Sequence, residues 1–189
     1  FRIDTHDELA VLQSSGGRTL YQNIGATRRT GAELAIDDSL AGGLNARLAY
    51  TWLRATVVDP YSTCLAQPCT PTVVPRGSRL PAVPAQSLYA ALTWRPQKFG
   101  LTVTLEVIGR ARIYANDLNS QWADGYWIGN LSAGVEQAHG PWIFSEYAHI
   151  DNLSDRRYVG SVIVNEGSSR YFEPGSERAA YLMFSASHH

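Results

Sequence analysis

The residues from Leu44 to Trp52 alternate between two kinds of side chain, and this period of two constrains the fold more than any other feature. The apolar members stand at every second position: Leu44, Ala46, Leu48, Tyr50 and Trp52. Between them stand Asn45, Arg47, Ala49 and Thr51. Successive side chains of a β-strand point to opposite faces, so this stretch predicts a strand with one apolar and one more polar face.

Weaker signals of the same kind predict about eight strands in the whole chain. The other expected strands are Phe1 to Leu12, about Thr19 to Asp38, 86–94, 101–112, 127–136, Trp142 to about Leu153, and Arg178 to His189. The pattern of the strand that begins at Trp142 does not assign its two faces. No segment of about a dozen residues has a clear 3.6-residue period, which argues against a βαβ fold. The expected fold class is therefore all-β and antiparallel.

The connections between these strands sort by length. Short turns follow the second, fourth and sixth expected strands, and longer connections follow the third, fifth and seventh. Only the connection after the first strand, Ser14 to Gly17, is shorter than this rule requires. An up-and-down sheet places alternate connections at opposite ends, and short turns at one end with long loops at the other are typical of outer-membrane barrels.

Composition is compatible with such a barrel. No apolar run of about 18 residues exists, which excludes a transmembrane helix, but a transmembrane strand needs only about 9–11 residues. The chain has 10 tyrosines, 5 tryptophans and 5 phenylalanines, which fit either a β-rich core or aromatic girdles at two membrane interfaces. The net charge of −1 argues against a nucleic-acid surface, which would be basic.

The run HIDNLSDRRYVGSVIVNEGSSRYFEP, residues 149–174, resembles a known family. It is similar to the last extracellular loop and flanking strands of TonB-dependent outer-membrane receptors, in the siderophore-receptor branch. The matching pieces are 151–153, 155–158, GSVIVNEG (160–167) and RYFEP (170–174). Further similar segments, in the family's order, are NIGATRRTGAELAI (23–36), RLPAVPAQSLYAAL (79–92) and YANDLN (114–119).

This resemblance implies an antiparallel up-and-down transmembrane β-barrel segment, one part of a barrel of about 22 strands. Residues 1–189 would be the C-terminal part of the barrel domain, without the plug domain. The implied function is TonB-dependent transport of a ferric siderophore or similar metal chelate across the bacterial outer membrane. The implied partners are that chelate, outer-membrane lipid and lipopolysaccharide, the receptor's own plug and the TonB complex.

Both ends of the chain fit a piece of an exported protein. Phe1-Arg2-Ile3-Asp4 is not a signal peptide, so we expect an internal or C-terminal segment. Barrels of this family usually finish on an aromatic residue, whereas this chain stops at Ser187-His188-His189. We expect the natural chain to continue by at least one residue, an aromatic on the face of Phe184.

The sequence predicts no enzyme, no cofactor and no metal site. No HExxH, GxSxG or Cys-rich motif occurs. Cys64 and Cys69 lie close together in a long loop, and we expect a disulfide there because a cell-surface loop is oxidising. The alternative, half of a metal site, lacks a nearby histidine. Asp151 and Asp155 are expected to form ordinary ion pairs with Arg156 and Arg157.

Polar and aromatic residues near the long-loop end are the candidates for contact with an anionic, flat chelate, because guanidinium groups and aromatic faces suit such ligands. The predicted set is Arg112, Tyr114, Asn116, Asp117, Trp122, Arg156, Tyr158, Arg170 and Tyr171. Further candidates are Arg76, Arg79, Asn119, Tyr126 and Arg157. Loop arginines can equally bind lipopolysaccharide phosphate or local carboxylates. Glu106 and Arg110 are expected to face the lumen and touch the plug.

Two other fold and function classes remain open at this point. A small closed eight-strand outer-membrane barrel with a structural or adhesive role would pair the first strand with the last. A soluble ligand-binding sandwich would bury Leu48 and Trp52 of one sheet against Val103 and Leu105 of another.

Overall fold

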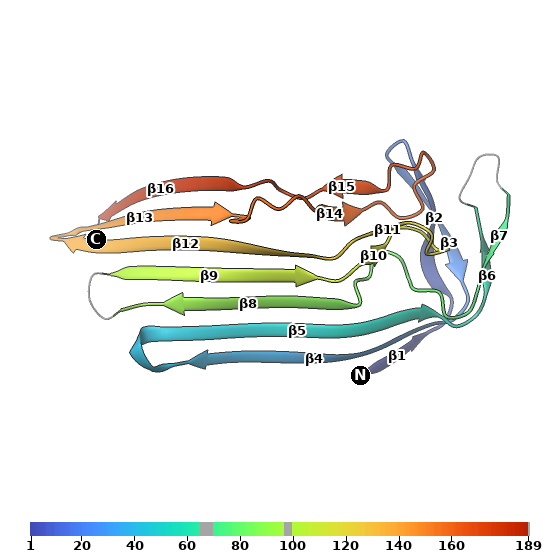
Figure 1. The fold of residues 1–189 in the computed structure, drawn as a ribbon, viewed down its shortest axis with the longest axis horizontal. Helices are drawn as coiled ribbons and strands as arrows, with labels where there is room; N and C mark the ends of the chain where they lie inside the picture. Colours follow the sequence, from blue (N-terminus) through green and yellow to red (C-terminus); the bar gives the residue numbers. More distant parts are fainter. Residues whose placement is uncertain (65–69, 97–99, 189) are drawn as a thin grey trace.

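A single large antiparallel sheet dominates the computed structural model, which describes residues 1–64, 70–96 and 100–188. Its eight strands lie side by side in chain order (Figure 1). They are β1 (Arg2–Thr5), β4 (Thr27–Ser39), β5 (Leu44–Val57), β8 (Gln86–Trp94), β9 (Leu101–Arg110), β12 (Tyr126–His139), β13 (Trp142–Asp151) and β16 (Ala179–His188). The all-β, antiparallel prediction is confirmed.

The two ends of the sheet differ in what they carry. At one end of the sheet, which we call the turn end, tight turns join β4 to β5 and β12 to β13. The turn between β4 and β5 contains the 3-10 helix η1 (Ala41–Gly43). At the opposite end of the sheet, which we call the hairpin end, the chain forms four small two-stranded sheets (Figure 1). These are β2 (Glu8–Ser15) with β3 (Arg18–Ile24), β6 (Tyr61–Thr63) with β7 (Thr72–Val74), β10 (Ile113–Tyr114) with β11 (Trp122–Ala123), and β14 (Val159–Val162) with β15 (Phe172–Pro174).

The expected first and second strands are wrong in extent, because each is split in two. The chain bends at Asp7, whose φ is +52°, so the predicted strand from Phe1 becomes β1 and β2. The second becomes β3 and β4, separated at Gly25, where a Cβ would lie 2.8 Å from the Asp59 side chain. The connection from β1 to β4 is therefore a full hairpin, and the apparent exception to the loop-length rule disappears.

The sheet has one apolar and one polar face, as the alternation predicts. Residues that are direct register partners share a face, so one row across the apolar face contains Ala46, Leu92, Leu105, Leu131 and Ile150. The neighbouring row on the polar face contains Arg47, Ala91, Glu106 and Asn130. The apolar side chains are not covered: Leu105 is 44% exposed and Phe184 64% exposed.

The soluble sandwich expected to bury Leu48 and Trp52 against Val103 and Leu105 does not form, and the apolar face has no second sheet packed on it among the described residues. Trp52 and Leu105 belong to the same sheet and the same face, rather than to two sheets packed together. The small closed barrel is also not supported, since β1 and β16 form opposite edges of an open sheet. Among the described residues, no helix is long and apolar enough to cross a membrane.

The faces of β13, which the sequence did not assign, follow from its register with β12 and β16. Trp142, Phe144 and Glu146 lie on the apolar face, while Ile143 and Tyr147 lie on the polar face. Each face of this strand mixes apolar and polar types, which hides the alternation. A buried hydrophobic cluster lies at the hairpin end and consists of Ala55, Val57, Val74 and Leu80.

Candidate functional site

The hairpin end is held together by a cluster of buried polar side chains. Asn165, which follows β14, is 1% exposed and contacts two other parts of the chain, β2 and the loop after β10. Its backbone N–H donates to the Ala115 carbonyl at 3.0 Å, and its side-chain Nδ2 donates to the Val11 carbonyl at 2.7 Å. The same Nδ2 donates to Asp117 Oδ2 at 2.8 Å. One asparagine thus connects the β2–β3 hairpin to the loop after β10.

Asp117 is the acceptor at the centre of this cluster and is 2% exposed. Besides Asn165, its carboxylate accepts hydrogen bonds from Thr63 Oγ1, at 3.1 Å, and from Tyr61. Burial raises the pKa of the Asp117 carboxyl, although these three donors act in the opposite direction. Burial likewise raises the pKa of Tyr61. The carboxylate therefore joins β6 to the loops of β10 and β14.

Asn116 closes the turn between β10 and β11. Its Oδ1 accepts the backbone N–H of Ser120 at 2.9 Å, and its Nδ2 donates to Ser120 Oγ at 2.8 Å. Asn119, with φ +55°, then bonds both backbone groups of Arg79, at 2.7 and 2.9 Å. These amides satisfy buried backbone groups, so their side chains are already occupied.

The Glu166 side chain likewise accepts hydrogen bonds from backbone N–H groups, here in the turn that contains Arg170. Its Oε2 accepts the backbone N–H groups of Arg170, at 2.9 Å, and Ser168, at 2.7 Å. The Arg170 N–H is the largest of the causes that lower the pKa of this carboxyl. The adjacent Tyr171 is only 7% exposed.

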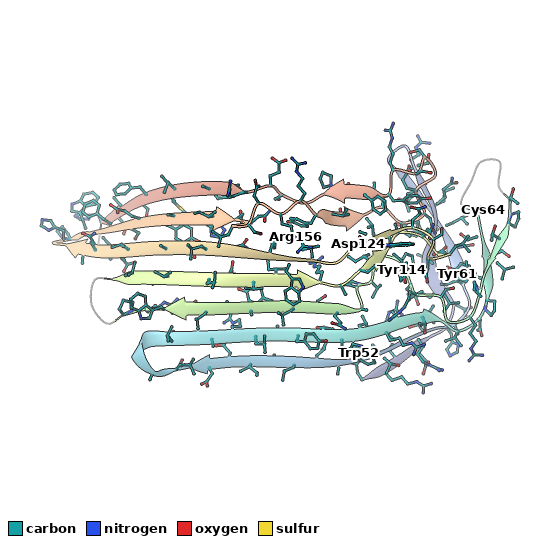
Figure 2. All side chains as sticks on the ribbon, in the orientation of Figure 1. Trp52, Tyr61, Cys64, Tyr114, Asp124 and Arg156 are labelled. Carbon is teal, nitrogen blue, oxygen red and sulfur yellow. The ribbon has the colours of Figure 1, made fainter. Side chains whose placement is uncertain are left out.

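An open hollow of about 590 Å³ lies beside this cluster, between β11, the start of β12 and the β14–β15 hairpin. Aromatic and charged side chains line it: Trp122, Asp124, Tyr126, Arg156, Arg157, Tyr158 and Phe172. The rings of Tyr126 and Tyr158 are 4.3 Å apart. Arg112 lies at its edge, with Cζ 4.8 Å from the Trp122 ring centre and a guanidinium nitrogen 3.4 Å from Asp124. Figure 2 shows Arg156, Asp124 and Tyr114 in this region.

The two arginines of the hollow do not form the ion pairs expected for them. Asp151 instead bonds His149, at 2.8 Å, and Asp155 lies 3.8 Å from Arg178. Asp155 has φ +52° in the turn after β13, which directs its carboxylate to the start of β16. Within the part of the chain that the structure describes, Arg156 and Arg157 form no ion pair. Both are exposed, so their charges remain available.

The predicted contact residues therefore separate into two groups. Trp122, Arg156 and Tyr158 line the hollow, with Arg112 at its edge, and Tyr114 is the register partner of Trp122. The others lie elsewhere: Asn116, Asp117 and Tyr171 are buried, and Arg170 is exposed on the Glu166 turn. Asp124 and Phe172 were not predicted, because each stands in a segment with no alternation to assign its direction.

Two further predictions have simple outcomes. Glu106 and Arg110 do lie on the polar face, where Glu106 accepts a hydrogen bond from Tyr89 at 2.6 Å. Cys69 lies outside the described residues, so the disulfide between Cys64 and Cys69 stays a prediction. Among residues 1–64, 70–96 and 100–188, no group of three or more His, Cys, Asp or Glu side chains could hold a metal ion.

Comparison with known proteins assigns the family. A family profile described as "TonB dependent receptor-like, beta-barrel" matches residues 1–153. The chain belongs to the TonB-dependent receptor β-barrel family. The prediction made from residues 149–174 is confirmed, although the matched region ends just as that run begins.

Individual relatives of this TonB-dependent receptor chain agree. It is 27% identical over 166 residues to the probable TonB-dependent siderophore receptor PiuA of Acinetobacter baumannii, covering 87% of this chain and 21% of the relative. The crystal structure of PiuA matches with a TM-score of 0.74 and 22% identity, over 98% of this chain and 24% of that one. The ferric preacinetobactin receptor BauA of the same species matches with a TM-score of 0.70 and 17% identity, over 98% and 26%.

The solved structures, at these identities, establish the barrel-wall fold. The chain spans about a fifth of the length of the curated PiuA sequence and about a quarter of the chains in the PiuA and BauA structures. The eight-stranded sheet matches one arc of the barrels of these solved receptors.

Proposed function

We propose that this chain forms part of the wall and extracellular loops of an outer-membrane receptor that takes up a ferric siderophore or similar metal chelate by TonB-dependent transport. The family supports this, and among its relatives PiuA is named a probable siderophore receptor and BauA a ferric preacinetobactin receptor. The observation that carries the proposal is the hollow at the hairpin end, where Arg156 and Arg157, which form no ion pair with any described residue, stand among aromatic rings.

The apolar face is proposed to contact lipid and the polar face to line the lumen. Exposed tryptophans stand on the apolar face at two levels: Trp94 and Trp142 near the turn end, Trp52 and Trp127 near the hairpin end. Trp94 is the register partner of Leu44, so it lies about 27 Å along β5 from Trp52. That spacing fits the apolar band of about 25 Å between the aromatic girdles of outer-membrane barrels.

The hollow suits an anionic chelate with flat groups. Arg156 and Arg157 offer planar, permanently charged donors, and Trp122, Tyr158 and Phe172 offer ring faces for stacking. Of the residues predicted from sequence, we propose Arg112, Trp122, Arg156 and Tyr158 as direct contacts. Asn116 and Asp117 support this surface by holding the loops in place, rather than by touching the chelate.

Other parts of the receptor are proposed to supply gating and energy. Glu106 and Arg110 on the polar face are positioned to meet a plug domain inside the barrel, and the TonB complex would act on that plug. A small closed barrel with an adhesive role is not favoured, because the sheet is open and its relatives are receptors.

Uptake by the full-length receptor tests the proposal. Cells from which the receptor gene has been deleted would be complemented with the wild-type receptor, the double variant Arg156→Gln/Arg157→Gln or the control variant Arg18→Gln. Arg18 is an exposed residue of β3. The cells would be given ⁵⁵Fe complexes of a catecholate, a hydroxamate and a carboxylate siderophore. We expect wild type and the control to accumulate one of these, and the double variant to lose about tenfold or more in apparent affinity. Wild-type cells that accumulate none, at normal receptor levels, would refute the proposal.

A further inference from the structure

Asp117 is a buried carboxylate without a cationic partner. It is 2% exposed and forms no ion pair with any residue that the structure describes. Its donors are all neutral: Asn165 Nδ2 at 2.8 Å, Thr63 Oγ1 at 3.1 Å, and the hydroxyl of Tyr61 (Figure 2). Neutral donors offset only part of the cost of burying a charge, so the ionised form of this side chain is held at some expense in stability.

The same partners can serve the protonated form of Asp117. The bonds from Asn165 and Thr63 both end on Oδ2, so a proton on Oδ1 leaves them intact. A hydroxyl group accepts as well as donates, so Tyr61 can turn and receive the new O–H. Protonation therefore removes the buried charge without leaving a hydrogen-bonding group unsatisfied.

The charges on β2, β4 and β6 do not favour the ionised form. The titratable side chain that β6 contributes is Tyr61, and the negative charge of Glu8 in β2 acts on that phenol. The guanidinium of Arg29 in β4 bonds Glu8, at 3.1 Å from Oε2, rather than Asp117. Burial is therefore the largest influence on the Asp117 carboxyl and raises its pKa, in spite of the three hydrogen bonds.

The other segments described at this junction direct their charges elsewhere. The loop after β14 supplies the neutral Asn165, while the carboxylate of its neighbour Glu166 accepts backbone N–H groups of its own turn. The segment after β7 supplies Arg79, whose guanidinium donates to the Leu53 carbonyl at 3.4 Å. A proton is thus the simplest means of neutralising Asp117.

The bonds between Asp117 and Asn165 join two walls of the hollow. Besides the side-chain bond, the Asp117 N–H donates to Asn165 Oδ1 at 3.1 Å. The loop of Asp117 leads into β11, which contains Trp122, and Asn165 lies between β14 and β15, the strand that begins at Phe172. Because Trp122 and Phe172 both line the hollow, a tighter junction holds its two sides at a fixed separation.

We propose that the Asp117 junction is a proton-sensitive switch, which tightens when the buried carboxyl group binds a proton and loosens when that group is ionised. A carboxyl group whose pKa is raised by folding stabilises the folded junction at low pH, and this contribution is lost as the pH rises through the folded-state value. The consequence for chelate affinity rests on the proposed function, whereas the switch itself needs no chelate.

Hydrogen exchange of the detergent-purified, full-length receptor without chelate tests the switch. After correction for the intrinsic exchange rate, we expect protection of β2 and of 113–119 to fall at least about threefold from pH 5 to pH 8. Asp117→Asn presents an amide N–H where the protonated acid has its O–H. This variant should be at least as protected as wild type at pH 8 and should not change with pH. Glu166→Gln, the same change at a carboxylate whose pKa is lowered, should instead reduce protection of its own turn at pH 8.

Wild-type protection that is constant or that rises from pH 5 to pH 8 would overturn the inference, and this result requires no variant to fold. A folded Asp117→Asn variant that is less protected than wild type at pH 8 would overturn it as well. Uptake of the ⁵⁵Fe complexes is a separate measurement. Cells that accumulate none of them contradict the proposed function, whereas pH-independent exchange contradicts the switch alone.

Discussion

Asn165 Nδ2 donates to Asp117 Oδ2 at 2.8 Å, across 48 residues of sequence and between two side chains that are each no more than 2% exposed. The bond joins the loop after β14 to the loop after β10. Asn165 also adopts φ +51°, a conformation that asparagine tolerates better than most residues. The position of the β2–β3 hairpin depends on this pair, since the same amide holds the Val11 carbonyl.

Replacing Asn165 should therefore loosen several loops at once. Asn165→Ala removes the donor of the buried Val11 carbonyl and one of the three donors of the Asp117 carboxylate, which we expect to destabilise the hairpin end by about 2–4 kcal/mol. Hydrogen exchange on the full receptor should show faster exchange in β2, β3 and 113–119. Asn45→Ala, which removes a bond to Ser39 at the turn end, is the control. Unchanged exchange in β2 and β3 would mean that the amide does not anchor them.

Glu166 gives the neighbouring turn a defined pH dependence. Its folded-state pKa lies below the ordinary value near 4.5, chiefly because the ionised carboxylate accepts the Arg170 N–H. A lowered carboxyl pKa stabilises the folded turn above about pH 4.5, and this stabilisation is lost as the pH falls through the folded-state value. Glu166→Gln should lower the protection factors of the Ser168 and Arg170 amides at pH 7. The difference from wild type should shrink below pH 4, and a constant difference at all pH values would contradict this origin.

The turn between β4 and β5 provides a test with two adjacent glycines. Both have positive φ, +75° at Gly42 and +78° at Gly43, but only Gly43 is crowded, since a Cβ there would lie 2.1 Å from the Arg95 carbonyl oxygen. Gly42→Ala should cost only the left-handed strain of about 1–2 kcal/mol. Gly43→Ala must also displace the neighbouring turn, so we expect a clearly larger loss. Urea unfolding in detergent measures both, and equal losses would show that the Arg95 contact is not rigid.

Sequence patterns identified most strands of the large sheet because these strands alternate between an apolar and a polar face, as Leu44 to Trp52 do. They failed where a backbone bend interrupts an extended stretch, at Asp7 and at Gly25. They located β13 but did not assign its faces, because Glu146 stands on the apolar face.

The sequence indicated the region of the candidate site, but not which of its residues are free to bind a ligand and which are already hydrogen-bonded within the protein. Asn116 and Asp117 have the composition of a ligand-binding loop, yet their donors and acceptors come from Ser120, Thr63 and Asn165. Partners that lie up to 54 residues away are set by the packing of four hairpins, which no local pattern encodes. The sequence likewise did not predict that Asp155 pairs with the distant Arg178 instead of with the neighbouring Arg156 and Arg157.

The proposed lipid and lumen faces can be compared directly at two consecutive alanines of β8. Ala90 stands on the apolar face between Leu48 and Val107, near the middle of the band, whereas Ala91 stands on the polar face beside Glu106. Ala90→Arg should destabilise the full-length barrel by about 2–4 kcal/mol, as expected for arginine at the bilayer midplane. Ala91→Arg carries the same added charge and should change stability little, because on the polar face it meets water and stands between Arg47 and the Glu106 carboxylate, whose effects on a new charge oppose each other. Urea titration in lipid vesicles measures both variants, and equal losses would contradict the assignment of the two faces.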